Sequence, residues 1–135
     1  MPKVREYMRT EIVRVPVDTP INEIAKLLWD NNIGSVLVFE DNEDNVLGFV
    51  DDRAIFKLIA ENRNPLEVDT RSIIKKLETH SVHLTVQELW DQVQDSISKV
   101  LGIEDDDGKV VGIMRKKTLA KLRFQVLKEE LGISD

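Results

Sequence analysis

The sequence contains one short pattern twice, and this duplication constrains the fold more than any other feature. Residues 46–55 and 110–119 each place an apolar run around a glycine, followed by charged residues and a second apolar-periodic stretch. The first run predicts a buried strand and the second a helix. The free backbone N–H groups and the dipole of a helix N-terminus suit an anion or a nucleotide. The chain therefore repeats a strand-to-helix junction that could serve as a binding site.

The composition is that of a globular chain. Of its 135 residues, 41% are hydrophobic and 33% charged, which leaves enough apolar surface for a core or for two small domains that share one. The absence of cysteine excludes disulfides, thiol catalysis and cysteine-ligated metals. No stretch approaches the roughly 18 apolar residues of a membrane span, and the N-terminus leads into no signal-peptide core. We expect a cytoplasmic protein without a membrane partner.

The net charge of −6 is unevenly distributed. Residues 115–131 carry Arg115, Lys116, Lys117, Lys121, Arg123 and Lys128 against Glu129 and Glu130. A basic stretch of this kind can mark a nucleic-acid-binding face. A solvated helix face is the favoured interpretation, and nucleic-acid binding is kept as the weaker alternative.

The first half of the chain alternates predicted strands and helices. Strands are predicted around Val13 to Val17, at 35–39 and at 46–50, and a helix at 20–31 with Thr19 as its N-cap. Asp51 or Asp52 should cap a further helix that begins after the third strand. The residues at 62–65 interrupt this helix and predict a linker in the middle of the chain.

The second half repeats this order. A short helix is predicted at 73–77, a strand around Val82 and Leu84, and a helix that opens with a capping box from Thr85 to Glu88. Strands at 99–104 and 110–114 then precede a helix at 116–131, which Gly132 should end. Trp29 and Trp90 lie on apolar helical faces, so both are expected in the core.

The order, spacing and duplication of these elements resemble the paired CBS domains of a Bateman module. Residues 4–8, 13–21, 33–38 and 48–50 carry the resemblance in the first repeat, and residues 82–86 and 110–114 carry it in the second. The resemblance implies an α/β (α+β) fold of two tandem β-α-β-β-α units, packed as a pseudo-two-fold pair. We place the first unit at residues 1–64 and the second at residues 65–135.

The resemblance also implies an adenine-containing ligand, such as AMP, ADP, ATP or S-adenosylmethionine, in a cleft between the two units. Family members use a Thr or Ser after the strand and an Asp three residues later, whose carboxylate accepts from the ribose hydroxyls. Asp51 and Ala54 occupy these positions in the first repeat, and Arg115 and Thr118 occupy them in the second. The ribose acceptor is therefore missing from the first repeat, and positive charge replaces the usual residues in the second.

The candidate ligand-binding residues follow from this comparison. Arg115, Lys116 and Lys117 could hold phosphate at a helix N-terminus, with a weaker ribose contact from Thr118. By resemblance, His80, Thr10, Ile12 and Val13 would line the adenine pocket. Asp51 is a candidate too, although helix capping is its favoured role. No metal ligands or catalytic residues are assigned, because no nucleophile with a base, acid pair or metal set is recognisable.

The favoured function is a regulatory or adaptor module that needs no cofactor and that binds an adenine compound in the second site. Ligand binding would change its affinity for a regulated partner protein. The alternative is an interaction module that has lost its ligand and acts by dimerisation, and we expect a homodimer in either case. We do not expect an enzyme.

Overall fold

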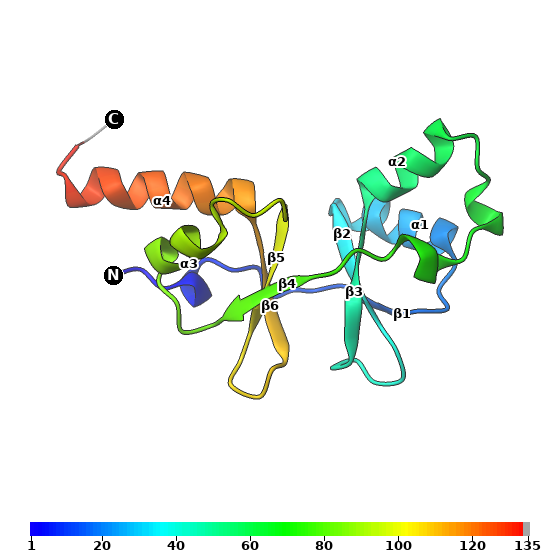
Figure 1. The fold of residues 1–135 in the computed structure, drawn as a ribbon, viewed down its shortest axis with the longest axis horizontal. Helices are drawn as coiled ribbons and strands as arrows, with labels where there is room; N and C mark the ends of the chain where they lie inside the picture. The colour runs from blue at the N-terminus through cyan, green and yellow to red at the C-terminus, as the bar shows by residue number, and fades with distance from the viewer. Residues whose placement is uncertain (134–135) are drawn as a thin grey trace. The chain divides into compact units, whose positions relative to one another are not determined.

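The computed structural model describes residues 1–133 of the chain. That part of the chain contains two three-stranded sheets, with strand orders β1-β2-β3 and β4-β5-β6, and four α-helices (Figure 1). Each sheet is accompanied by two helices in the order β-α-β-β-α. The predicted mixed α/β fold with two such repeats is confirmed.

The first repeat builds its sheet around the central strand β2. Parallel pairing joins β1 to β2 and antiparallel pairing joins β2 to β3. The chain passes through β1 (Arg14–Pro16), α1 (Ile21–Asn31), β2 (Ser35–Phe39), β3 (Val46–Asp51) and α2 (Asp52–Ala60). The β1-to-β2 crossover is helical because parallel neighbours cannot be joined by a tight turn.

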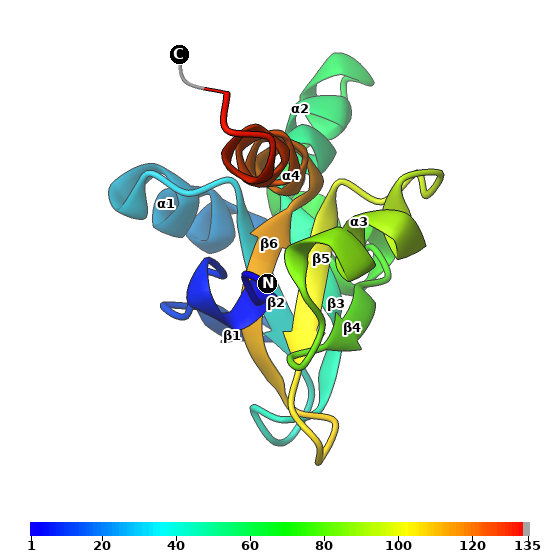
Figure 2. The ribbon, with the colours of Figure 1, turned by 90° about the vertical axis from the view of Figure 1, so that its left-hand side faces the viewer.

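The second repeat has the same topology. Strand β5 pairs in parallel with β4 and antiparallel with β6. The elements are β4 (Glu78–Ser81), α3 (Val86–Val93), β5 (Val100–Glu104), β6 (Val110–Arg115) and α4 (Lys116–Glu130). Figures 1 and 2 show α3 and α4 next to each other beside this sheet.

The segment ahead of each repeat's first strand pairs with the sheet of the other repeat. Arg9, which precedes β1, forms an antiparallel bridge with Ile113 of β6. Lys75, which precedes β4, forms the corresponding bridge with Phe49 of β3. Each bridge is formed by two backbone hydrogen bonds of 2.9 Å. The 3-10 turns η1 (Val4–Glu6), η2 (Pro65–Glu67) and η3 (Thr70–Ile73) belong to these two segments.

This exchange decides which residues form each compact unit. One unit consists of Ile12–Lys76, here called the repeat-1 unit. The other consists of Met1–Glu11 together with the chain from Leu77 onward, here called the repeat-2 unit. These units do not coincide with the predicted division into 1–64 and 65–135. The difference arises because backbone pairing assigns each leading segment to the opposite repeat.

Each unit has its own hydrophobic core between its sheet and its helices. In the repeat-1 unit, the buried residues are Val15, Ile21, Ile24, Leu28, Val36, Val38, Val50, Ile55 and Leu58. In the repeat-2 unit, they are Val4, Val86, Leu89, Val93, Leu101, Ile103, Met114 and Leu119. Their spacing on the helices places one apolar stripe against each sheet.

Most predicted elements are confirmed, but three predictions near the start of an element are wrong. The first strand of the second repeat is Glu78–Ser81 rather than a strand around Val82 and Leu84. Its position is set by parallel pairing with β5, whereas Val82 and Leu84 follow it and pack against the core. The short helix predicted at 73–77 is the 3-10 turn Thr70–Ile73. The N-cap of α1 is Pro20 rather than Thr19.

The two tryptophans differ in burial. Trp90 packs against the core of the repeat-2 unit, with the Arg123 guanidinium 5.8 Å from its ring centroid. Trp29 is 85% exposed, so its predicted place in the core is wrong. It follows the buried Leu28 on α1, and one step of about 100° turns it away from the sheet.

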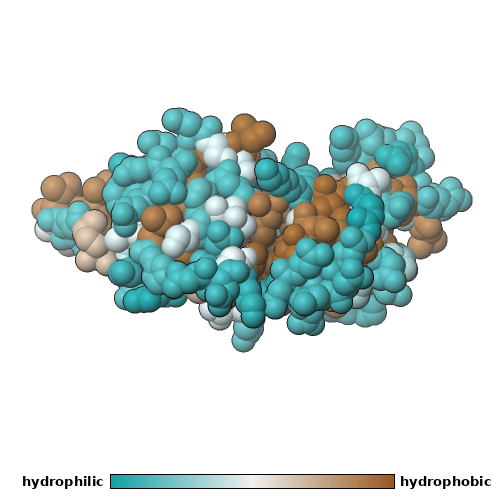
Figure 3. All heavy atoms as spheres, turned by 60° about the horizontal axis from the view of Figure 1, so that its bottom comes forward, coloured by the Kyte–Doolittle hydropathy of each residue, from teal (hydrophilic) through white to brown (hydrophobic). Residues whose placement is uncertain are grey.

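The face of the molecule drawn in Figure 3 is largely hydrophilic, with hydrophobic patches between the hydrophilic residues. Among residues 1–133, no helix is both long enough and apolar enough to cross a membrane.

Candidate functional site

The first strand-to-helix junction is closed by Asp51. Its Oδ1 accepts a hydrogen bond of 2.9 Å from the backbone N–H of Ala54, so Asp51 is the N-cap of α2. The ammonium group of Lys75 lies 3.0 Å from Oδ2 and 3.2 Å from Oδ1 of the same carboxylate. The predicted capping role is confirmed. An adjacent ammonium group also offsets the negative charge that Asp51 would present to a phosphate.

Lys75 reaches this junction because of the long-range pairing described above. It pairs with Phe49, which lies two positions before Asp51 on β3. The close approach requires Gly48, because a Cβ at this position would overlap the carbonyl oxygen of Lys75. A backbone contact therefore fixes the cation beside the carboxylate.

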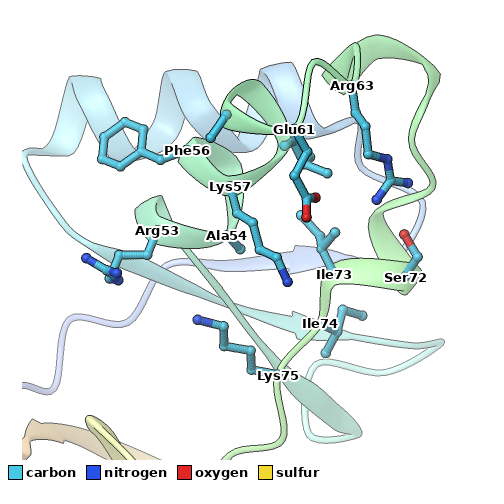
Figure 4. A pocket seen from close by; sticks show the side chains of 12 residues that line it. Arg53, Ala54, Phe56, Lys57, Glu61, Arg63, Ser72, Ile73, Ile74 and Lys75 are labelled. Carbon is cyan, nitrogen blue, oxygen red and sulfur yellow. The ribbon is translucent and has the colours of Figure 1, made fainter.

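A cavity of about 740 Å³ lies beside α2 within the repeat-1 unit (Figure 4). We call it the α2 cavity. One wall is the helix and the other is the segment that leads to β4. The lining residues are Arg53, Ala54, Phe56, Lys57, Leu58, Ala60, Glu61, Arg63, Ser72, Ile73, Ile74 and Lys75.

The wall of the α2 cavity is predominantly cationic. Its charged residues are Arg53, Lys57, Arg63 and Lys75 against Glu61. Figure 4 shows Lys57 and Glu61 extending from α2 toward the segment at Ile73–Lys75, while Arg63 points toward Ser72. Among the described residues, the side chains of Arg53, Lys57 and Arg63 have no hydrogen bond or ion pair with one another or with other residues.

The charged residues of this cavity were not predicted from the sequence. Arg53, Lys57 and Glu61 are spaced four residues apart, so helical periodicity alone places them along one side of α2. Lys75 could not be assigned to the same site, because its place depends on the bridge to Phe49.

The second junction has no corresponding cap. Arg115 occupies the N-cap position of α4, and its side chain makes no capping hydrogen bond. The residue that matches Lys75 is Arg9, which pairs with Ile113 two positions before Arg115. The guanidinium Nε of Arg9 donates to the Glu11 carbonyl at 3.0 Å. This junction therefore has an arginine at each of the two positions that Asp51 and Lys75 occupy in the first.

The other predicted phosphate-binding residues are arranged unevenly. The Lys116 ammonium group donates to the Gln94 carbonyl at 3.1 Å and also to the Ser96 carbonyl, so it is bound to the loop after α3. Lys117 and Thr118 are exposed on the first turn of α4. Thr10 belongs to the repeat-2 unit, but Ile12 and Val13 belong to the repeat-1 unit, where Val13 packs on the core. The ligand roles of this set stay predictions.

His80 lies on β4, whereas the sequence predicted that the first strand of the second repeat comes after it, around Val82 and Leu84. Its Nε2 is 2.7 Å from a Glu78 carboxylate oxygen, and its Nδ1 is 3.0 Å from the Gln92 side-chain oxygen. Burial opposes ionisation of Glu78, but hydrogen bonds from Ser96 and His80 outweigh it and lower the pKa of the carboxyl. His80 is therefore part of a polar network at the edge of the second sheet.

Comparison with known proteins supports the fold and places a CBS domain in the first part of the chain. Residues 4–61 match the family model of the CBS domain. An uncharacterized protein of Methanopyrus kandleri is 28% identical over 122 residues, which cover 88% of this chain and 61% of that protein. The chain thus spans about three fifths of that relative. A homoserine O-acetyltransferase of Methanosalsum zhilinae is 24% identical over 119 residues, covering 88% of this chain but 23% of the enzyme.

Solved structures extend the similarity to nearly the whole chain. A CBS domain protein of unknown function from Thermoplasma acidophilum has a TM-score of 0.76 at 25% identity, covering 88% of this chain and 67% of that one. A CBS domain protein from Pyrobaculum aerophilum, solved in complex with AMP, has a TM-score of 0.76 at 18% identity. The match covers 90% of this chain and 98% of that one. Residues 4–61 therefore match a CBS domain, and the chain has the fold of a CBS-domain pair.

Proposed function

We propose that the chain is a regulatory CBS module that binds an adenine nucleotide in the α2 cavity. The observation that carries this proposal is the cavity itself, which combines positive charge and apolar surface in one unit. Its volume of about 740 Å³ lies within the range of about 300–1,000 Å³ that is usual for small-molecule pockets.

The two kinds of surface in the cavity match the two ends of a nucleotide. Leu58, Ile73 and Ile74 offer apolar contacts to a base. The cationic side chains on α2 and on the opposite wall attract phosphate, and arginine can bind it through two parallel hydrogen bonds. The AMP bound to the Pyrobaculum aerophilum protein supports the choice of adenine compounds as the ligands to test.

Helix α2 also provides a route from ligand to partner. An apolar groove of about 320 Å³ lies between α1 and α2, lined by Ala25, Leu28, Trp29, Asn32, Ile33, Asp52, Ile55 and Phe56. Phe56 lines both this α1/α2 groove and the α2 cavity. A ligand that favours one position of α2 changes the affinity of whatever occupies the groove, and the groove's occupant changes the ligand affinity by the same factor.

Isothermal titration calorimetry of the full chain tests the nucleotide proposal. AMP, ADP, ATP and S-adenosylmethionine are titrated separately at about 50 mM salt, where surface charges are weakly screened. We expect binding of at least one adenine nucleotide. Absence of heat and of any thermal stabilisation at millimolar concentrations of all four compounds would remove the proposal.

A second candidate function is self-association through the α1/α2 groove. Trp29, Phe56 and Ile59 are 85%, 64% and 59% exposed, so α1 and α2 together present three large apolar side chains to solvent. Trp29 and Phe56 also line the groove, so the same patch offers projecting aromatic rings and a recess. A second copy of the chain is the partner that this self-complementary patch fits. Sedimentation should show a dimer that Phe56→Ser weakens, and a monomer at high concentration contradicts the idea.

A further inference from the structure

We propose that the α2 cavity recognises its ligand by phosphate charge and not by the ribose hydroxyls, so that its ligand class is the nucleoside polyphosphates. This inference rests on the proposed nucleotide site and adds which part of the nucleotide determines affinity. It follows from the charges in the cavity wall and from the side chain at the first turn of α2.

The cavity wall has more positive than negative charges even when Lys75 is left out because it pairs with Asp51. Lys75 is offset by Asp51 at 3.0 Å. Arg53, Lys57 and Arg63 then remain against Glu61. A wall with this balance attracts an anion, and the attraction increases with each charge that the ligand carries.

A ribose, by contrast, finds little to bind it at the start of α2. A carboxylate can accept hydrogen bonds from both neighbouring hydroxyls of the sugar. The first turn of α2 instead contributes the methyl group of Ala54 to the cavity. The nearby Asp51 carboxylate already accepts from the Ala54 N–H and contacts Lys75. Among the residues that line the cavity, Glu61 is the one with a carboxylate. It is the C-cap of α2 and so lies at the other end of the helix from Ala54.

Recognition by charge has consequences that recognition of ribose does not. The cations of the wall are solvent-exposed, so their attraction for phosphate should be weakened by salt. S-adenosylmethionine carries a sulfonium cation and no phosphate, so the cavity should reject it. Affinity should rise from AMP to ADP to ATP, by about tenfold or more over the series at about 50 mM salt.

The first experiment compares ligands by calorimetry on the full chain. ATP, 2′-deoxy-ATP, AMP, adenosine and inorganic tripolyphosphate are titrated at about 50 and 500 mM salt. We expect equal affinities for ATP and 2′-deoxy-ATP within about twofold, weaker binding of AMP, no binding of adenosine, and loss of affinity at high salt. Equal affinities for AMP and ATP, or a loss of tenfold or more with 2′-deoxy-ATP, overturn the inference.

These outcomes separate the inference from the function on which it rests. If AMP binds as well as ATP, the proposed nucleotide function stands and recognition by charge fails. If tripolyphosphate binds and no adenine compound binds more tightly, charge recognition stands, but the adenine specificity and the assignment to nucleoside polyphosphates both fail. If no compound binds, both fail.

A matched pair of variants tests the residues. Lys57→Glu reverses a charge inside the cavity and should weaken ATP binding by tenfold or more. Lys26→Glu makes the same charge change on α1 in the same unit, where Lys26 pairs with Asp30 outside the cavity, and should alter ATP binding less than twofold. Equal losses in the two variants contradict the assignment. Glu61→Gln should maintain or improve ATP binding, whereas a tenfold loss would show that Glu61 holds the ribose.

Discussion

The two strand-to-helix junctions share a backbone plan but differ in chemistry. At the first, the Asp51 carboxylate accepts a hydrogen bond from the N-terminus of α2 and also forms an ion pair with the Lys75 ammonium group. At the second, Arg115 leaves α4 without a side-chain cap, and Arg9 stands where Lys75 does in the first repeat. A duplicated fold can therefore keep the same pairings while one copy has an ion pair at the junction and the other has two arginines at the same positions.

The same contrast extends to the first strand of each repeat. Val15 of β1 pairs with Val38, and His80 of β4 pairs with Ile103 in the corresponding register. Val15 is buried in the core, whereas His80 joins a network with Glu78 and Gln92. The edge strand of the first sheet thus contributes a core residue at the position where the edge strand of the second contributes a polar one, although both sheets have the same topology.

The largest expected effect on stability is the difference between Gly48 and Gly112, the two glycines against which the segments before β4 and β1 pack. A Cβ at Gly48 meets the backbone carbonyl of Lys75, while a Cβ at Gly112 meets the flexible side chain of Met8. Gly48→Ala should lower the free energy of unfolding by about 3 kcal/mol and Gly112→Ala by about 1 kcal/mol, because a side chain yields more easily than a backbone. Urea denaturation measures both. A greater loss for Gly112→Ala would reverse the comparison.

The next effect distinguishes the two tryptophans. Trp90 packs on the core and under Arg123, so Trp90→Ala should cost about 2–3 kcal/mol of unfolding free energy. Trp29 is exposed, so Trp29→Ala should change stability by less than about 0.5 kcal/mol in the monomer. The measurement is made by urea denaturation at low protein concentration. A large loss for Trp29→Ala there would contradict the described packing of α1.

Truncation of the side chains at the N-caps of α2 and α4 should have different effects on stability at the two junctions. Asp51→Ala removes a cap and is expected to cost about 1 kcal/mol. Arg115→Ala removes no cap and should change stability by less than about 0.5 kcal/mol. Arg115→Ser supplies a capping hydroxyl and should stabilise α4. Thermal denaturation of the three variants gives the order, and equal costs for Asp51→Ala and Arg115→Ala would refute it.

The smallest effect concerns pH and the second sheet. Hydrogen bonds from Ser96 and His80 outweigh the burial of Glu78 and lower its pKa. A carboxyl with a lowered folded pKa stabilises the protein above its ordinary pKa, and this contribution is lost as the pH falls through the folded pKa. The stability difference between wild type and Glu78→Gln should therefore shrink between about pH 5 and pH 3. A difference that is constant over this range would contradict the role of the network.

The sequence predicted the parts of the fold that depend on local patterns. Strand Ser35–Phe39, the cap at Asp51 and the capping box at Thr85 are found as predicted, because apolar runs and cap residues act over a few positions. Strand β4 was missed because Glu-Thr-His-Ser has no apolar alternation, and only its pairing with β5 makes it a strand. The α2 cavity was missed for a similar reason, since its second wall comes from residues 72–75 held by the bridge of Lys75 to Phe49.

The most direct test of the central claim is a two-dimensional NMR titration of the isotope-labelled full chain with ATP. If the α2 cavity is the binding site, amide signals of residues 53–61 and 72–75 should shift with a common saturation curve, while those of residues 115–118 stay in place. Shifts confined to residues 115–118, with the signals of the α2 cavity unchanged at saturating ATP, would contradict the account and assign the ligand to the uncapped second junction.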